Sequence, residues 1–190
     1  MKMNKEIRSF GDVEQNIDSR KVSGYAMLFD TESVYLGFYE TISRGALTQE
    51  LVDNCDVFAR FDHDPSKVLA RSNHGQGSLK LTVDERGLKY EFDAPNTALG
   101  DELLEYIRRG DMSKSSFCFA LDPNDSCDKW EKRGNDYYRT INKISAIYDV
   151  SPVWSPAYPD TNVDNRSFKE ITENEANLNS KLQEILSLAI

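Results

Sequence analysis

A histidine, a serine and an aspartate lie in three segments whose residue types suit nucleophilic hydrolysis. They are His63 in FDHD, Ser116 in SKSSFCF and Asp149 in IYDVSPVWSPAYPDT. A serine hydroxyl is a weak nucleophile until a neighbouring base takes its proton, and that base needs a third group to fix its tautomer. Because the chain has only two histidines, His63 is the main candidate for the base.

The two histidines also have ordinary interpretations. His63 lies between Asp62 and Asp64 in a polar turn, where a solvated histidine is common. The alternating strand before it would nevertheless hold it at a strand end. His74 lies in SNHGQGS, a loop rich in glycine and serine, and we expect it to be exposed or close to substrate rather than catalytic.

Two adjacent serines compete for the role of nucleophile. Ser115 and Ser116 are neighbours on a predicted strand and therefore point to opposite faces, so only one can face His63. Either can also be an ordinary hydroxyl at the start of a strand. Cys118 shares a face with Ser116 and offers a rival thiol nucleophile, although a buried cysteine is more often a small apolar residue.

Asp149 is the candidate acid. It follows Ile147 and Tyr148 in an apolar run, where a carboxylate is costly unless it is paired. The ordinary alternative is a strand-end aspartate that meets water or an arginine. No cluster of histidine, cysteine and acidic residues has the spacing of a metal site, so we expect neither a metal nor a cofactor.

The elements around these residues are mostly strands. Alternation predicts a strand over 56–63, with Val57, Ala59 and Phe61 on one face, that leads into the turn DHDPSK. Other predicted strands are 22–30, 33–43, 68–72, 115–121 and one or two within 137–154, together with a hairpin over 78–95 around the turn DERG.

Two internal helices accompany the strands. They are predicted over 45–52 and over 97–109, the second capped by Thr97 and ended by Gly110. No βαβ alternation and no glycine-rich phosphate loop appears. The expected fold is mainly β with flanking helices (α+β): a mostly antiparallel sheet, closed or nearly closed into a small barrel ringed by helices.

The length predicts one folded domain, and the two terminal segments are expected to differ from it. Residues 1–20 are expected to form a loose arm or an edge strand, 21–167 the folded domain, and 168–190 an amphipathic helix or tail. Residues 122–138 read as a polar connection. The tail carries an apolar stripe that can pack on the domain, pair with another copy or serve as a removable segment: Ile171, Leu178, Leu182, Ile185, Leu186 and Ala189.

Composition restricts the partners and the compartment. The net charge of −9 disfavours general nucleic-acid binding, because an acidic surface repels phosphate backbones. No apolar run reaches the length of a membrane span, and the N-terminus lacks the pattern of a signal peptide, so we expect a cytoplasmic protein. Three cysteines without a CxxC pair are expected to stay reduced.

Taken together, the segments resemble the tailed-phage prohead (procapsid maturation) serine protease family, which is distantly similar to herpesvirus assemblin. The resemblance spans about residues 22–166. It is carried by the joint order of VSGYAMLFD, FYETISRGAL, FDHDPSKVLARS, SLKLTVDERGLKYEFDAP, IRRGDMSKSSFCF and ISAIYDVSPVWSPAYPDTNVDNR.

The resemblance implies an enzyme and its partners. It implies a serine endopeptidase that works inside the assembling procapsid, in the cytoplasm of the bacterial host. It would cut the scaffolding region from the phage major capsid protein, and itself, before DNA enters. An assemblin-like barrel and a homodimer formed through a helix are also implied. The alternative is a non-catalytic capsid-assembly or scaffold protein that kept the fold.

The resemblance also implies roles for residues. His63 is the general base, and Ser116, directly before Phe117 in the family's S-F-x-F pattern, is the nucleophile. Asp149 is the acid, at a site where other members carry Glu, and Cys118 replaces a common glycine. The oxyanion donor would lie within 155–158; because Pro156 has no N–H, Ala157 is the candidate.

Overall fold

The computed structural model describes residues 5–15, 19–154, 173, 176–178 and 180–181, which contain twelve strands and two helices. The strands are Lys5–Gln15 (β1), Lys21–Leu28 (β2), Tyr39–Ile42 (β3), Asp56–Arg60 (β4), Val68–Asn73 (β5), Gln76–Gly77 (β6), Lys80–Val83 (β7), Gly87–Asp93 (β8), Lys114–Ala120 (β9), Asp128–Arg133 (β10), Asp136–Ile141 (β11) and Ala146–Val153 (β12). The helices are Gln49–Asp53 (α1) and Ala98–Arg109 (α2).

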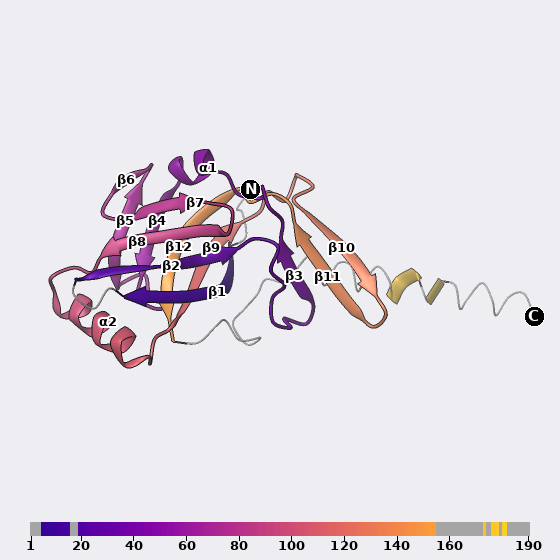
Figure 1. Ribbon diagram of the computed structural model, residues 1–190. Coiled ribbons are helices and arrows are strands. Elements are labelled where there is room, and N and C mark those ends of the chain that lie inside the picture. The colour runs from indigo at the N-terminus through magenta and orange to yellow at the C-terminus, as the bar shows by residue number, and fades with distance from the viewer. Residues whose placement is uncertain (1–4, 16–18, 155–172, 174–175, 179, 182–190) are drawn as a thin grey trace, which may run out of the picture.

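The strands form two sheets (Figure 1). The larger has nine strands in the order β6-β5-β4-β12-β9-β1-β2-β8-β7, and the smaller has the order β10-β11-β3. All pairings between named strands are antiparallel except β12 with β4 and β11 with β3. A mainly β fold with few helices was predicted and is confirmed.

The nine-stranded sheet brings its two edges near each other. Its edge strands β6 and β7 follow one another in the chain with only Ser78 and Leu79 between them. The Leu79 N–H donates to the carbonyl of Arg71 at 3.1 Å, which holds this connection against β5. Among the described strands, however, β6 does not pair with β7, so the predicted barrel is not closed by hydrogen bonds.

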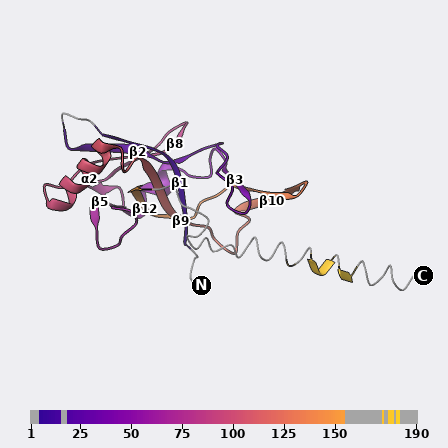
Figure 2. The ribbon, with the colours of Figure 1, turned by 90° about the horizontal axis from the view of Figure 1, so that it is seen from below.

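Local sequence explains the two best-predicted elements. Thr97 caps α2 by accepting a hydrogen bond from the Gly100 N–H, and Gly110 ends the helix in the left-handed conformation that favours glycine (φ 79°). In the β7–β8 hairpin, the Asp84 carboxylate accepts bonds from the N–H groups of Arg86 and Gly87. Figures 1 and 2 show α2 at the end of the large sheet that lies away from the small sheet.

Strand β1 corrects the expectation of a loose arm or edge strand. It lies inside the large sheet, between β9 and β2. The segment looked like a surface strand because it carries Glu6 and Arg8, but both side chains are buried. The division of the chain at residues 20 and 167 stays a prediction.

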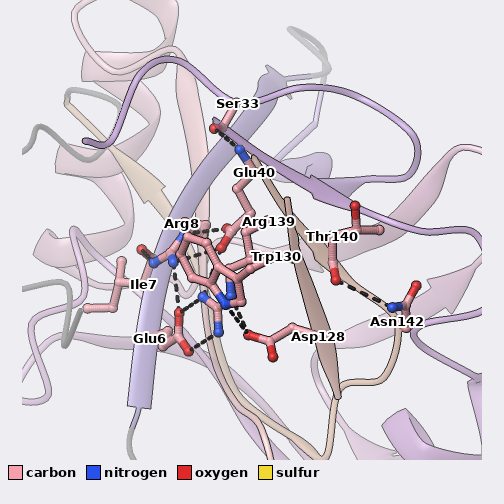
Figure 3. A network of polar contacts seen from close by, with 10 residues as sticks. All are labelled: Glu6, Ile7, Arg8, Ser33, Glu40, Asp128, Trp130, Arg139, Thr140 and Asn142. Atoms are coloured by element: carbon pink, nitrogen blue, oxygen red, sulfur yellow. Dashed lines mark hydrogen bonds and ion pairs between the residues drawn. The ribbon is translucent and has the colours of Figure 1, made fainter. Parts of the chain in front are cut away.

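Glu6 and Arg8 can be buried because they form an ion network with the small sheet (Figure 3). Arg8 on β1 contacts Glu40 on β3 at 2.5 Å and Glu6 at 2.7 Å. Arg139 on β11 bonds the same two glutamates, at 2.6 Å to Glu6 and 2.9 Å to Glu40, and its Nε bonds Asp128 on β10 at 2.7 Å. These pairs join the two sheets.

Three further segments differ from their predictions. In 33–43 only Tyr39–Ile42 is a named strand. The helix expected over 45–52 begins at Gln49, because Thr48 is its cap, and Gly45 before it has φ 91°. The polar connection 122–138 contains β10, whose residues pair with β11 in a hairpin. Lys129, Lys132 and Arg133 are exposed, whereas Asp128 bonds Arg139, and Trp130 packs edge-on against Phe38 at 4.8 Å.

Of the apolar stripe predicted in the tail, Leu178 is described and exposed. The other members, Ile171, Leu182, Ile185, Leu186 and Ala189, lie outside the described residues. How this segment packs therefore stays a prediction.

Candidate active site

Three neighbouring parts of the large sheet carry the predicted trio. Asp149 lies on β12 and Ser116 on the adjacent strand β9, while His63 lies in the turn that follows β4, the other neighbour of β12. The register pairs Ser116 with Ser151 and Asp149 with Cys118. Paired residues share a face, so Ser116 and Asp149 lie on the same face of the sheet.

The turn after β4 is tied to β12 and aims His63 at that face. The Asp62 N–H donates to the carbonyl of Pro152 at 3.0 Å, and the Phe61 N–H donates to that of Lys67. Asp62 and His63 both have left-handed backbones, with φ values of 51° and 59°. Two successive non-glycine residues in this region are uncommon, and such backbone strain is concentrated at functional sites.

The three side chains form a continuous chain of hydrogen bonds. His63 Nε2 lies 2.6 Å from Ser116 Oγ, and His63 Nδ1 lies 2.5 Å from Asp149 Oδ1. Ser116 and Asp149 are buried, whereas the His63 side chain is 18% exposed. The arrangement can move a proton from a hydroxyl to an imidazole whose cationic form a carboxylate stabilises.

Asp149 has partners for both of its carboxylate oxygens. The Ser151 hydroxyl donates to Oδ1 at 3.0 Å, beside His63, and Arg60 Nη1 donates to Oδ2 at 3.2 Å. These bonds offset the cost of burying a charge. Neither partner was predicted from the sequence. Strand alternation could have indicated both, because Arg60 lies on the face opposite Val57 and Ala59, and Ser151 is two residues from Asp149.

The structure separates the two adjacent serines as predicted. The Ser115 hydroxyl shares a hydrogen bond of 2.8 Å with the Tyr90 hydroxyl, on the face opposite His63. Burial raises the pKa of Tyr90. Ser116 alone of the pair bonds His63.

The rival nucleophile and the remaining candidates do not join this arrangement. Burial, and then the charge of Asp149, raise the pKa of the Cys118 thiol to about 12, which disfavours its thiolate. His74 is exposed in the turn between β5 and β6, and no described contact joins it to the trio. Ala157 and the rest of the oxyanion candidates at 155–158 lie outside the described residues.

The described residues contain no group of three histidine, cysteine or acidic side chains that can hold a metal ion.

Comparison with known proteins decides the family. A family model described as the caudovirus prohead serine protease matches residues 9–174, most of the chain. The chain belongs to this family. The matched range contains His63, Ser116 and Asp149, and the family predicted from the sequence is confirmed.

The fold of this prohead serine protease family member also has a solved counterpart. The bacteriophage T4 capsid assembly protease, gp21, aligns with a TM-score of 0.53 and 12% sequence identity over 82% of this chain and 100% of that chain. At this identity the likeness concerns the fold. No curated protein matches the chain. Within the part that the structure describes, no helix is long and apolar enough to cross a membrane.

Proposed function

We propose that this protein is the serine endopeptidase of procapsid maturation, with Ser116 as nucleophile, His63 as general base and Asp149 as the acid that orients the base. The observation that carries the proposal is the continuous chain of hydrogen bonds from Ser116 Oγ through His63 to Asp149. The family match supports the reaction class.

The geometry suggests how each residue acts. With the Nδ1 proton held by Asp149, the free Nε2 of His63 takes the hydroxyl proton as Ser116 Oγ attacks the carbonyl carbon of the substrate. The imidazolium then gives that proton to the leaving amine. Departure of the amine leaves an acyl-enzyme ester on Ser116. Water, deprotonated by His63, hydrolyses the ester and restores the hydroxyl.

The resting hydroxyl has a second acceptor. Ser116 Oγ lies 2.8 Å from the carbonyl oxygen of Arg8 on β1, besides its contact with His63. A hydroxyl has one proton, so these two acceptors compete for it. Attack requires it to pass to His63.

The family match also suggests the substrates. We propose that the enzyme cuts the scaffolding region of the phage major capsid protein, and itself, inside the procapsid in the host cytoplasm. We further propose that it works as a homodimer, that its curled sheet corresponds to an assemblin-like barrel, and that the Ala157 N–H donates to the oxyanion.

Replacement of the nucleophile tests the proposal. Ser116→Ala, co-expressed with the major capsid protein, is expected to abolish cleavage of the scaffolding region and labelling by a fluorophosphonate, because no hydroxyl remains to attack. Ser115→Ala is the matched control: it removes the neighbouring hydroxyl from the opposite face and is expected to keep both reactions.

Three results would contradict the assignment. Normal processing by Ser116→Ala would rule out Ser116 as the nucleophile, and loss of processing in Ser115→Ala alone would move the role to the other face. Absence of labelling in the folded wild-type dimer would favour the non-catalytic assembly protein.

A further inference from the structure

The side chain of Arg60 lies beside the proposed catalytic acid and has an unusual set of partners. It is the last residue of β4, and its side chain is 22% exposed. Its Nη1 donates to Asp149 Oδ2, and its guanidinium lies 5.1 Å from the ring centroid of Phe58. Its Nε is buried without a hydrogen-bond partner among the described residues. The contacts that orient Arg60 are therefore Asp149 and the Phe58 ring.

The contacts of Asp149 are divided between its two oxygens. His63 Nδ1 and the Ser151 hydroxyl both contact Oδ1, and Arg60 contacts Oδ2. A bond to the second oxygen fixes rotation about the last side-chain torsion, which is otherwise soft for aspartate. Without it, the carboxylate can turn so that Oδ1 no longer faces Nδ1.

Arg60 is also a cation in direct contact with Asp149. Their ion pair joins Arg60 Nη1 to Asp149 Oδ2 at 3.2 Å, and the Asp149 side chain is almost fully buried. A buried carboxylate is costly unless it is paired, so this contact offsets the cost of holding the Asp149 charge beside His63.

We propose that Arg60 is a positioning residue of the hydrolytic site. It holds the Asp149 carboxylate in the rotation that orients His63. This inference rests on the proposed function, because it concerns the same reaction.

Arg71 provides a matched control on the adjacent strand. It lies on β5, opposite Phe58 in the register, with its guanidinium 4.9 Å from the same ring. It bonds Asp56 through two nitrogens, at 2.7 and 2.8 Å, and is about half exposed. It therefore shares the strand environment and the stacking of Arg60 without a described contact to Asp149.

The experiment measures the rate of fluorophosphonate inactivation, because this probe needs no knowledge of the peptide substrate. Arg60→Gln is expected to lower the rate about tenfold, the effect of losing one hydrogen bond to a charged group. Arg60→Lys keeps a cationic donor at this position and is expected to recover part of the rate. Arg71→Gln is expected to match the wild type.

The outcomes separate this inference from the proposed function. If Ser116→Ala removes labelling but Arg60→Gln keeps the wild-type rate, the inference is wrong and the proposed function stands. A rate lowered equally in the Gln and Lys variants shows a purely structural role and also overturns it. If Ser116→Ala is labelled like the wild type, the proposed function itself fails. Should Arg60→Gln not fold, Arg60→Met takes its place, with the same expected and contradicting results.

Discussion

Two largely buried clusters of polar side chains lie on different strands, and they differ in how their hydrogen bonds are arranged. The ion network joins β1, β3, β10 and β11, whereas the trio lies on β9, β12 and the turn after β4. In the ion network of Figure 3, Glu6 and Glu40 are shared by Arg8 and Arg139, so each charge meets at least two partners. In the proposed hydrolytic site the bonds lead from the Asp149 carboxylate through His63 to the neutral hydroxyl of Ser116.

The difference separates a structural role from a chemical one. In the ion network each charge is held by at least two partners, and removing one member leaves the remaining buried charges with fewer partners. In the proposed site a proton can move from the Ser116 hydroxyl to His63, whose cationic form the Asp149 carboxylate stabilises. Variants of the first cluster should therefore change stability, and variants of the second should change rate.

The largest expected effect comes from replacing Asp149, the acid of the proposed site. In Asp149→Asn the carboxamide cannot stabilise the His63 imidazolium, and it favours the wrong tautomer. We expect the rate of fluorophosphonate labelling to fall by about 10³–10⁴, by analogy with serine proteases that lose this group. Circular dichroism should show an unchanged fold, and a wild-type labelling rate would exclude Asp149 from the site.

The next effect breaks the ion network. Glu40→Ala leaves Arg8 and Arg139 to share fewer carboxylates in a buried position, and we expect a loss of about 3–5 kcal/mol in the free energy of unfolding. Urea denaturation measures it. Glu131→Ala on β10 is the control, since its pairs with Lys129 and Arg133 are on the surface, and it should change stability little. Equal effects of the two variants would contradict the contrast between the clusters.

Acid should weaken the network through Glu6. Burial alone would raise the pKa of this carboxyl, but the hydrogen bond and charge of Arg139 and the charge of Arg8 outweigh it and hold the pKa below the usual 4.5. The stabilisation is therefore present above pH 4.5 and is lost as the pH falls through the lower folded value. Unfolding free energies measured from pH 6 to 3 should fall more steeply for the wild type than for Glu6→Gln, and parallel curves would refute this.

The same contrast explains what the sequence alone could predict. Alternation along a strand is a local property, so residue positions were enough to assign Ser115 and Ser116 to opposite faces. The signals for α2 were local too: Thr97 and Gly110 cap it as expected. The family resemblance supplied His63 and Asp149, which single-residue patterns left no better than solvated alternatives.

The buried ion network was missed because its pairs are not local. Arg8 meets Glu40 across 32 positions and Arg139 meets Glu6 across 133. A charged residue considered alone predicts exposure. The sequence of β1 was therefore interpreted as an arm or edge strand, and that of β10 as part of a polar connection. Only the three-dimensional pairing shows that these charges neutralise one another inside the protein.

The smallest expected effect concerns the thiol on the face of the proposed nucleophile. With the pKa of Cys118 raised to about 12, its thiolate is about one part in 10⁴ at pH 8, so the thiol is a poor nucleophile. Cys118→Ala is expected to keep fluorophosphonate labelling and capsid-protein cleavage close to the wild type. The reason is that the thiol lies on the same face as Ser116 but has no described hydrogen bond to the trio. If the Cys118 variant lost activity and Ser116→Ala kept it, the reaction would belong to the thiol, and the line of hydrogen bonds would have another purpose.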